Sequence, residues 1–136
     1  MAALTEDRRL EKYAGDELAY KVAASTIIYA NSLVCLNTSG YAVPAADTEN
    51  YKFLGVATEY VDNSAGANGD RTVRVWRKGV FEFGASALAI TNIGDNVHVL
   101  NDQTVGTAAQ ATNDIACGKI AGFRSATSVL VDIDMR

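Results

Sequence analysis

The clearest alternation of apolar and polar side chains lies at Thr72–Phe83, with the sequence TVRVWRKGVFEF. Four large apolar residues of this stretch share the odd positions: Val73, Val75, Phe81 and Phe83. A period of two places alternate side chains on opposite faces of a strand, so the pattern predicts a strand with one buried face. Arg77 and Gly79 interrupt the apolar positions. Gly79 therefore marks either a bulge in one long strand or part of a turn between two short ones.

Other short apolar runs, bounded by turn residues, predict the remaining strands. Asn37–Gly40 and Asn101–Asp102 each separate two of these runs, which indicates hairpins. Gly84–Asn96 is expected to form a short helical turn or to cover the end of a barrel. About nine short strands with little helix predict a mainly β fold, either a small β-barrel or a β-sandwich-like domain. The other runs are Thr26–Tyr29, Leu33–Leu36, Tyr41–Val43, Phe53–Val61, Val97–Leu100, Thr104–Val105, Ile120–Phe123 and Val129–Ile133.

The N-terminal residues, 1–20, are interpreted as an arm in front of a single β-rich domain at 21–136. Thr5 is followed by two acidic residues, which is typical of a helix start, and Gly15 of a helix end. Leu10 and Tyr13 lie three apart on one side of such a helix. A helix of about two turns is marginal alone in water, so we expect a short helical or extended arm that orders against its own domain or a neighbour. A frayed terminus is the alternative.

The composition is that of one folded domain with an acidic balance. The chain has 136 residues, of which 49% are hydrophobic, enough for a single core without disulfides or metal. A net charge of −4 and a pI near 4.9 argue against a nucleic-acid partner. The N-terminus is charged where a secretion signal would be apolar, and no apolar run approaches the ~20 residues of a membrane-spanning helix. The densest basic cluster falls on mixed strand faces and predicts a solvated surface: Arg71, Arg74, Arg77 and Lys78.

Residues for catalysis are sparse. The one histidine, His98, lies between Val97 and Val99, which predicts a surface or interface side chain rather than a catalytic base. Cys35 and Cys117 are far apart without a ligand spacing, so they are expected to be buried thiols, with a disulfide between them as the alternative. With one histidine and isolated cysteines, no transition-metal site is expected. No spacing among the acidic residues selects a pair for glycoside cleavage.

The loop Asp62–Asp70 has oxygen-bearing side chains at alternating positions, a pattern that suggests calcium. A calcium loop of the EF-hand type requires a glutamate at its twelfth position, and counting from Asp62 that position is Val73. Turn chemistry is therefore the better interpretation. The glycines form no phosphate-binding motif. The sequence thus predicts no catalytic, cofactor-binding or metal-binding residue, and a protein that is not an enzyme.

Short phrases rich in glycine and small apolar residues follow one another in a characteristic order. They are Ile28–Val34, Gly40–Ala45, Phe53–Ala57, Val61–Ser64, Gly69, Val73–Val75, Lys78–Phe81, Ile93–Val99 and Gly118–Gly122. In this order the chain resembles the small decoration, or cement, proteins of tailed-bacteriophage heads. The resemblance covers about Leu18 to Ile133, and the order of the phrases carries it, since each phrase alone has little specificity.

The resemblance implies a β-rich domain on the outer surface of a capsid, commonly a trimer at three-fold or quasi-three-fold axes, that strengthens the shell against internal DNA pressure. The implied partner is the major capsid protein, and the implied location is the virion, after synthesis in the bacterial host cytoplasm. The family has no catalytic residues to carry over. In this family an N-terminal arm often makes the contacts with the capsid. The resemblance therefore implies such a role for the arm Ala2–Tyr20, which would become ordered on binding. The candidate capsid-contact or oligomer-interface residues are Leu4, Arg8, Leu10, Tyr13, Arg74, Trp76 and Lys78.

Two other functions remain as alternatives. The first is another phage structural part, such as a tail or head-completion protein, for which rings rather than trimers are expected. The second is a carbohydrate-binding β-module that uses Trp76 and nearby tyrosines as stacking platforms. A lone tryptophan lies more often in a core or an interface, so the structural virion protein is the leading hypothesis.

Overall fold

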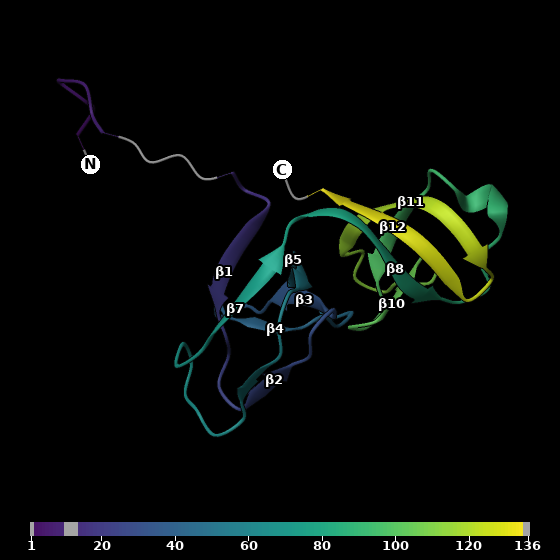
Figure 1. The fold of residues 1–136 in the computed structure, drawn as a ribbon, viewed down its shortest axis with the longest axis horizontal. Helices are drawn as coiled ribbons and strands as arrows, with labels where there is room; N and C mark the ends of the chain where they lie inside the picture. The colour runs from purple at the N-terminus through teal and green to yellow at the C-terminus, as the bar shows by residue number, and fades with distance from the viewer. Residues whose placement is uncertain (1, 10–13, 135–136) are drawn as a thin grey trace.

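The computed structural model describes residues 2–9 and 14–134, which are almost entirely strand and loop (Figure 1). The mainly β fold predicted from the sequence is confirmed. In chain order the elements of the described residues are β1 Glu17–Lys21, β2 Thr26–Ile28, β3 Leu33–Leu36, β4 Ala42–Pro44, β5 Lys52–Ala57, β6 Val61–Asn63, β7 Thr72–Trp76, β8 Lys78–Ala85, the 3₁₀ turn η1 Ile90–Asn92, β9 Asn96–Val99, β10 Thr104–Gly106, β11 Ala116–Ser125 and β12 Ser128–Asp134.

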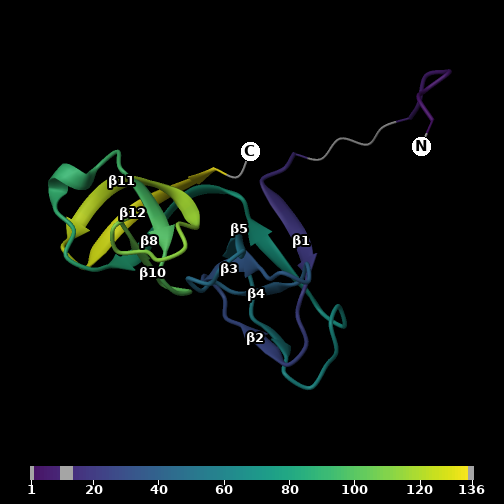
Figure 2. The same cartoon turned by 180° about the vertical axis from the view of Figure 1, so that it is seen from behind.

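The strands form three sheets that divide the chain near its middle. The first half builds a five-stranded sheet in the order β1-β7-β5-β3-β4 and a two-stranded sheet of β2 and β6. The second half closes into a barrel in the order β10-β8-β12-β11-β9, and the two halves lie beside each other in both views (Figures 1 and 2). Val22, directly after β1, bridges to Ala42 of β4, and the N–H of Ala23 donates to the Ala42 carbonyl at 3.0 Å. The five-stranded sheet therefore curls until the chain at one edge touches the other.

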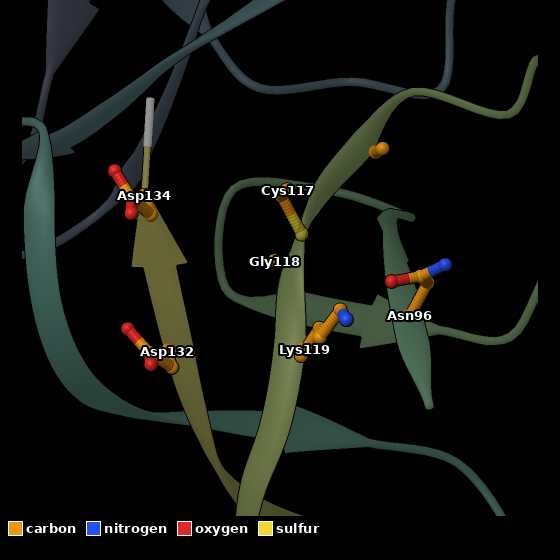
Figure 3. Close-up of a pocket in the computed structure, with 7 residues that line it drawn as sticks. Asn96, Cys117, Gly118, Lys119, Asp132 and Asp134 are labelled. Atoms are coloured by element: carbon orange, nitrogen blue, oxygen red, sulfur yellow. The ribbon is translucent and has the colours of Figure 1, made fainter. Parts of the chain in front are cut away.

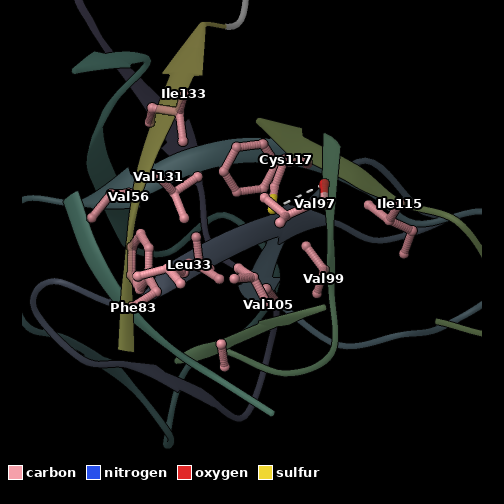
Figure 4. Close-up of a cluster of buried hydrophobic side chains, with 14 of the residues drawn as sticks. Leu33, Val56, Phe83, Val97, Val99, Val105, Ile115, Cys117, Val131 and Ile133 are labelled. Carbon is pink, nitrogen blue, oxygen red and sulfur yellow. Dashed lines mark hydrogen bonds between the residues drawn. The ribbon is translucent and has the colours of Figure 1, made fainter. Parts of the chain in front are cut away.

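Two apolar cores cover both faces of the five-stranded sheet. The larger core combines side chains of this sheet, such as Leu33, with side chains of the barrel strands, such as Val97 and Val131 (Figure 4). The smaller core lies on the other face and includes Val34 together with Ile28 of β2 and Val61 of β6. Successive residues of β3 thus enter different cores, which explains why Leu33–Leu36 reads as a continuous apolar run without alternation.

Thr72–Phe83 forms two short strands, which was one of the two predicted alternatives, and the predicted alternation of buried side chains holds in β7. The break lies at Arg77 rather than Gly79, and the strands belong to different sheets, so the stretch does not share one buried face. Val73 and Val75 of β7 lie in the smaller core, whereas Phe83 of β8 lies in the larger core. Arg77, between the strands, donates its N–H to the Asp16 carbonyl at 2.7 Å. The chain crosses here from the five-stranded sheet into the barrel. The large apolar residues stay on odd positions on both sides of the crossing. Those of β7 pack in the smaller core, and those of β8 pack in or against the larger core.

Gly79 is expected to tolerate substitution less well than Arg74. Its φ of +129° is a conformation that L side chains rarely adopt, and a Cβ there would lie 3.2 Å from the Phe81 ring. We therefore expect Gly79→Val to lower the free energy of unfolding by about 2 kcal/mol. Arg74→Ala removes an exposed side chain and is expected to change it by less than about 0.5 kcal/mol. Thermal melts of both variants measure the ranking, and the reverse order would contradict it.

Both predicted hairpins are confirmed, because β3 pairs with β4 and β9 with β10 in antiparallel registers. The helical turn expected within Gly84–Asn96 is η1. The single strand predicted at Phe53–Val61 is wrong, since β5 ends at Ala57 and the chain turns before β6 pairs with β2. The cysteines are buried and free, as expected.

The N-terminal helix predicted from Thr5 is not confirmed, because residues 2–9 contain no helix. Leu10 and Tyr13, which were to define one side of that helix, lie outside the described residues. Residues 17–20, assigned to the arm on sequence grounds, belong to β1, which pairs with β7 over its whole length. The segment that precedes the sheet therefore ends by Asp16.

Candidate interaction surfaces

The three contact candidates on the central strands do not form one stripe. Arg74 is exposed on β7, whereas Trp76 is half-buried and packs against the larger core, with its ring centroid 5.6 Å from that of Phe81. Lys78 begins β8 and forms an ion pair with Asp16 at 3.6 Å. Because Trp76 is engaged by the core, it is not the open stacking platform that the carbohydrate-module alternative requires.

The N-terminal candidates lie on an exposed segment. Residues 2–9 are exposed throughout, including Arg8, and Leu4 has 69% of its surface open to solvent. In both views this segment lies away from the sheets (Figures 1 and 2). Contact with a partner would remove the apolar Leu4 side chain from water, which is favourable, so this segment is a candidate contact surface.

A groove of about 490 Å³ opens beside the bulge between Ala116 and Gly118 of β11, where Lys119 pairs with Asp132 of β12 (Figure 3). Cys117 borders this groove, but its thiol donates to the Val97 carbonyl at 3.6 Å, and burial raises its pKa to about 12. A thiol with that pKa is protonated at neutral pH and is a poor nucleophile. The groove therefore presents a lysine and carboxylates without a nucleophile and base in contact.

Val97 and Val99 are buried, and His98 lies on the opposite strand face, as the alternation predicted. The His98 side chain is half-buried. Its Nδ1 atom is buried and has no hydrogen-bond partner among the described residues. Beside it, Asp47 accepts the backbone N–H groups of Thr112 and Asn113 at 2.7 and 2.9 Å. The Asn113 side-chain amide also donates to the Asp47 carbonyl at 2.9 Å. These bonds join the connection after β4 to the connection between β10 and β11, and so link the two halves.

The hydrogen bonds that join Asp47 to Thr112 and Asn113, the Asp47 clasp, predict that the stability of the fold depends on pH. The hydrogen bond from Thr112 is the largest cause that lowers the pKa of Asp47 below its ordinary value. A group with a lower pKa in the folded state stabilises the fold above its unfolded pKa, and this contribution is lost as the pH falls through the folded pKa. We expect Asp47→Asn to lower the free energy of unfolding at neutral pH by about 1 kcal/mol, since the part-exposed carboxylate is screened by solvent.

Urea unfolding of Asp47→Asn at neutral pH and at about pH 3 measures this effect, which should be smaller at the acidic pH. The control is Asp114→Asn, which removes the same charge from an exposed position of the connection between β10 and β11, the segment that Asp47 binds. Equal losses for both variants at neutral pH would contradict the clasp.

The loop that suggested calcium is organised by turn hydrogen bonds. Asn63, only 2% exposed, donates its side-chain amide to the carbonyls of Ala23 and Ala67 at 2.8 and 3.1 Å. Asp70 accepts the N–H of Ala67 at 2.8 Å, and Asp62 accepts a backbone N–H two residues further on. The role of Asn63 was missed, because an asparagine beside turn residues gives no sign of burial in a sequence.

A pair of exposed tyrosines was also missed. Tyr29 follows β2 and Tyr60 precedes β6, and the pairing of Ile28 with Val61 brings them side by side. Their ring centroids are 5.8 Å apart with planes tilted by 46°, and 59% and 55% of their surfaces are exposed. The two residues are far apart in sequence, so only the pairing of β2 with β6 reveals them as a surface.

Within residues 2–9 and 14–134, no three histidine, cysteine or acidic side chains are close enough to hold a metal ion. In the same described part of the chain, no helix has the length and apolar character needed to cross a membrane. Comparison with protein-family models, curated proteins and solved structures gives no match for the chain. The surfaces of the molecule are therefore the basis for assigning its function.

Proposed function

We propose that this chain is a structural virion protein without enzymatic activity that decorates and stabilises the outer surface of a phage capsid. Its partner in this proposal is the major capsid protein, to which it binds as a homotrimer. The observation that carries the proposal is the exposed N-terminal segment at residues 2–9. In it Leu4 is 69% exposed and lies close in sequence to four consecutive charged residues, Glu6–Arg9. Such a segment can contribute an apolar anchor and charged contacts to a neighbouring protein.

The body of the protein supports this role by fixing the point from which the arm departs. The carbonyl of Asp16, directly before β1, accepts the N–H of Arg77 at 2.7 Å, and its carboxylate pairs with Lys78 at 3.6 Å. The next five residues form β1, which pairs with β7. Ordering the arm on a partner costs about 1–2 kcal/mol per residue in backbone entropy, so each arm binds weakly. A symmetric oligomer with several arms compensates by binding at several points at once.

The oligomeric state is measured by light scattering coupled to size-exclusion chromatography. Three copies of the 14.4 kDa chain give a mass of about 43 kDa, which the proposal expects. A ring of more copies would favour a tail or head-completion protein. A strictly monomeric protein that also ignores capsids would contradict the proposal.

Capsid binding is measured by co-sedimentation with expanded, undecorated heads. The full chain is expected to bind at saturable sites, and a variant that begins at Gly15 is expected to bind much more weakly. Residues 2–9 contribute no side chain to either core, so the body of this variant is expected to remain folded. Thermal melting checks this. The substitution Leu4→Asp tests the apolar anchor within the complete chain. Absence of saturable binding by the full chain would contradict the proposal.

A further inference from the structure

We propose that the exposed Tyr29–Tyr60 pair is a binding platform for a neutral oligosaccharide. The proposed capsid role does not require this ligand, so the two proposals can fail independently. The two rings form a continuous aromatic surface, since their centroids are only 5.8 Å apart and more than half of each residue is exposed. The 46° tilt between their planes lets successive sugar rings of a twisted chain meet one tyrosine each.

A polar cleft adjoins each ring. The cleft beside Tyr29 has a volume of about 350 Å³, and the one beside Tyr60 about 370 Å³. Both volumes lie at the lower end of the range for small-ligand sites. Tyr29 lines one cleft and Tyr60 lines the other, so the pair of rings joins the two polar clefts. Their other lining residues are Ala30, Asn31, Ser32, Asp102 and Gln103 in the first, and Glu59, Val61, Asp62, Arg71 and Thr72 in the second.

The walls of the first cleft are held in place by hydrogen bonds. Asn31, in a left-handed conformation with φ +65°, donates its N–H to the Ala57 carbonyl at 2.8 Å. The Ser32 hydroxyl donates to the Tyr29 carbonyl at 2.7 Å. Asp102 also lines this cleft, and its carbonyl accepts the N–H of Leu33 at 2.8 Å. A surface that is already ordered loses little conformational entropy when a ligand binds.

The polar groups of these clefts favour a neutral ligand over a basic protein segment. Glu59 accepts the N–H of Arg74 at 3.3 Å, and Asp62 shares its cleft with Arg71. The carboxylates beside Tyr60 are therefore partly engaged, which weakens their attraction for a cation. Asn31 and Gln103 are exposed, and each side-chain amide can both donate and accept. Sugar hydroxyls need both kinds of partner, while their C–H faces pack on aromatic rings.

The test is a titration of ¹⁵N-labelled protein, without capsids, followed by NMR. The probes are maltohexaose, cellohexaose and N-acetylchitohexaose, with a hexa-arginine peptide as the cationic comparison. We expect at least one oligosaccharide to shift the side-chain amide signals of Asn31 and Gln103 in a saturable way. Tyr29→Ala and Tyr60→Ala should each weaken its binding about tenfold, and Tyr60→Phe by less than about twofold, because the phenylalanine ring still stacks.

Ile90→Ala is the matched control, since it removes an apolar side chain that is 64% exposed on η1, and it should leave binding unchanged. The proposal is overturned if none of the three oligosaccharides saturates at about 10 mM. It is also overturned if binding is unaffected by the alanine substitutions at the tyrosines. Shifts at the platform with the arginine peptide alone would likewise overturn it and assign the surface to a basic protein segment.

Discussion

Gly55→Ala is expected to prevent folding or to lower the free energy of unfolding by at least about 3 kcal/mol. Gly55 lies in the middle of β5 with a φ of +153°, which L side chains rarely adopt. A Cβ at this position would overlap the carbonyl oxygen of Trp76 in β7. That oxygen belongs to the backbone, and the chain enters β8 two residues later, so it has little freedom to move away.

The matched control for Gly55→Ala is Gly94→Ala. Gly94 also has a positive φ, +92°, but a methyl group added there would meet no atom within 4 Å, so only backbone strain remains. We expect Gly94→Ala to cost about 1 kcal/mol. Chemical denaturation followed by circular dichroism measures both variants. Equal losses of stability would show that the close approach of β5 to β7 does not constrain the fold.

Leu33→Ala is expected to lower the free energy of unfolding by about 2–5 kcal/mol, the range for truncating a fully buried leucine. Leu33 is fully buried on β3 and enters the larger core from the side of the five-stranded sheet. The barrel supplies the other side of that core through residues such as Val99 and Val131. Because both halves share the core, we expect the variant to unfold in one transition at a lower denaturant concentration.

Leu4→Ala makes the same chemical change at a leucine that is 69% exposed, and it is expected to alter stability by less than about 0.5 kcal/mol. Denaturant titrations followed by both near-ultraviolet and far-ultraviolet circular dichroism test the pair. Two separate transitions for Leu33→Ala would contradict a core shared between the sheet and the barrel. A loss as small as that of Leu4→Ala would contradict the burial of Leu33.

The parts of the fold that were predictable from the sequence are those set by local signals. Turn residues at Asn37–Gly40 placed the hairpin of β3 and β4, and the side chain of Asn37 accepts the N–H groups of Ser39 and Tyr41 there. The alternation of Val97 and Val99 placed β9 and put His98 on the opposite strand face from the two valines. In each case a few consecutive residues determine the conformation, so no distant partner has to be known.

The parts that were not predictable depend on which distant segments meet. The parity of Val75 and Phe83 is the same in the sequence, yet these residues enter different cores because the chain changes sheets at Arg77. Phe53–Val61 reads as one apolar strand, yet pairing of β6 with β2 divides it. The same pairing creates the Tyr29–Tyr60 surface. Trp76 was predicted as a contact residue, but its ring packs against Phe81. The sequence does not show this packing.

The proposed capsid role is tested most directly by locating the chain in a purified virion by electron cryomicroscopy. We expect density that fits the barrel and the curled five-stranded sheet on the outer surface of the head, with three copies around a three-fold or quasi-three-fold axis. The segment at residues 2–9 should contact the major capsid protein. Density for this fold in the tail or at the portal, or heads that lack it altogether, would contradict the proposal.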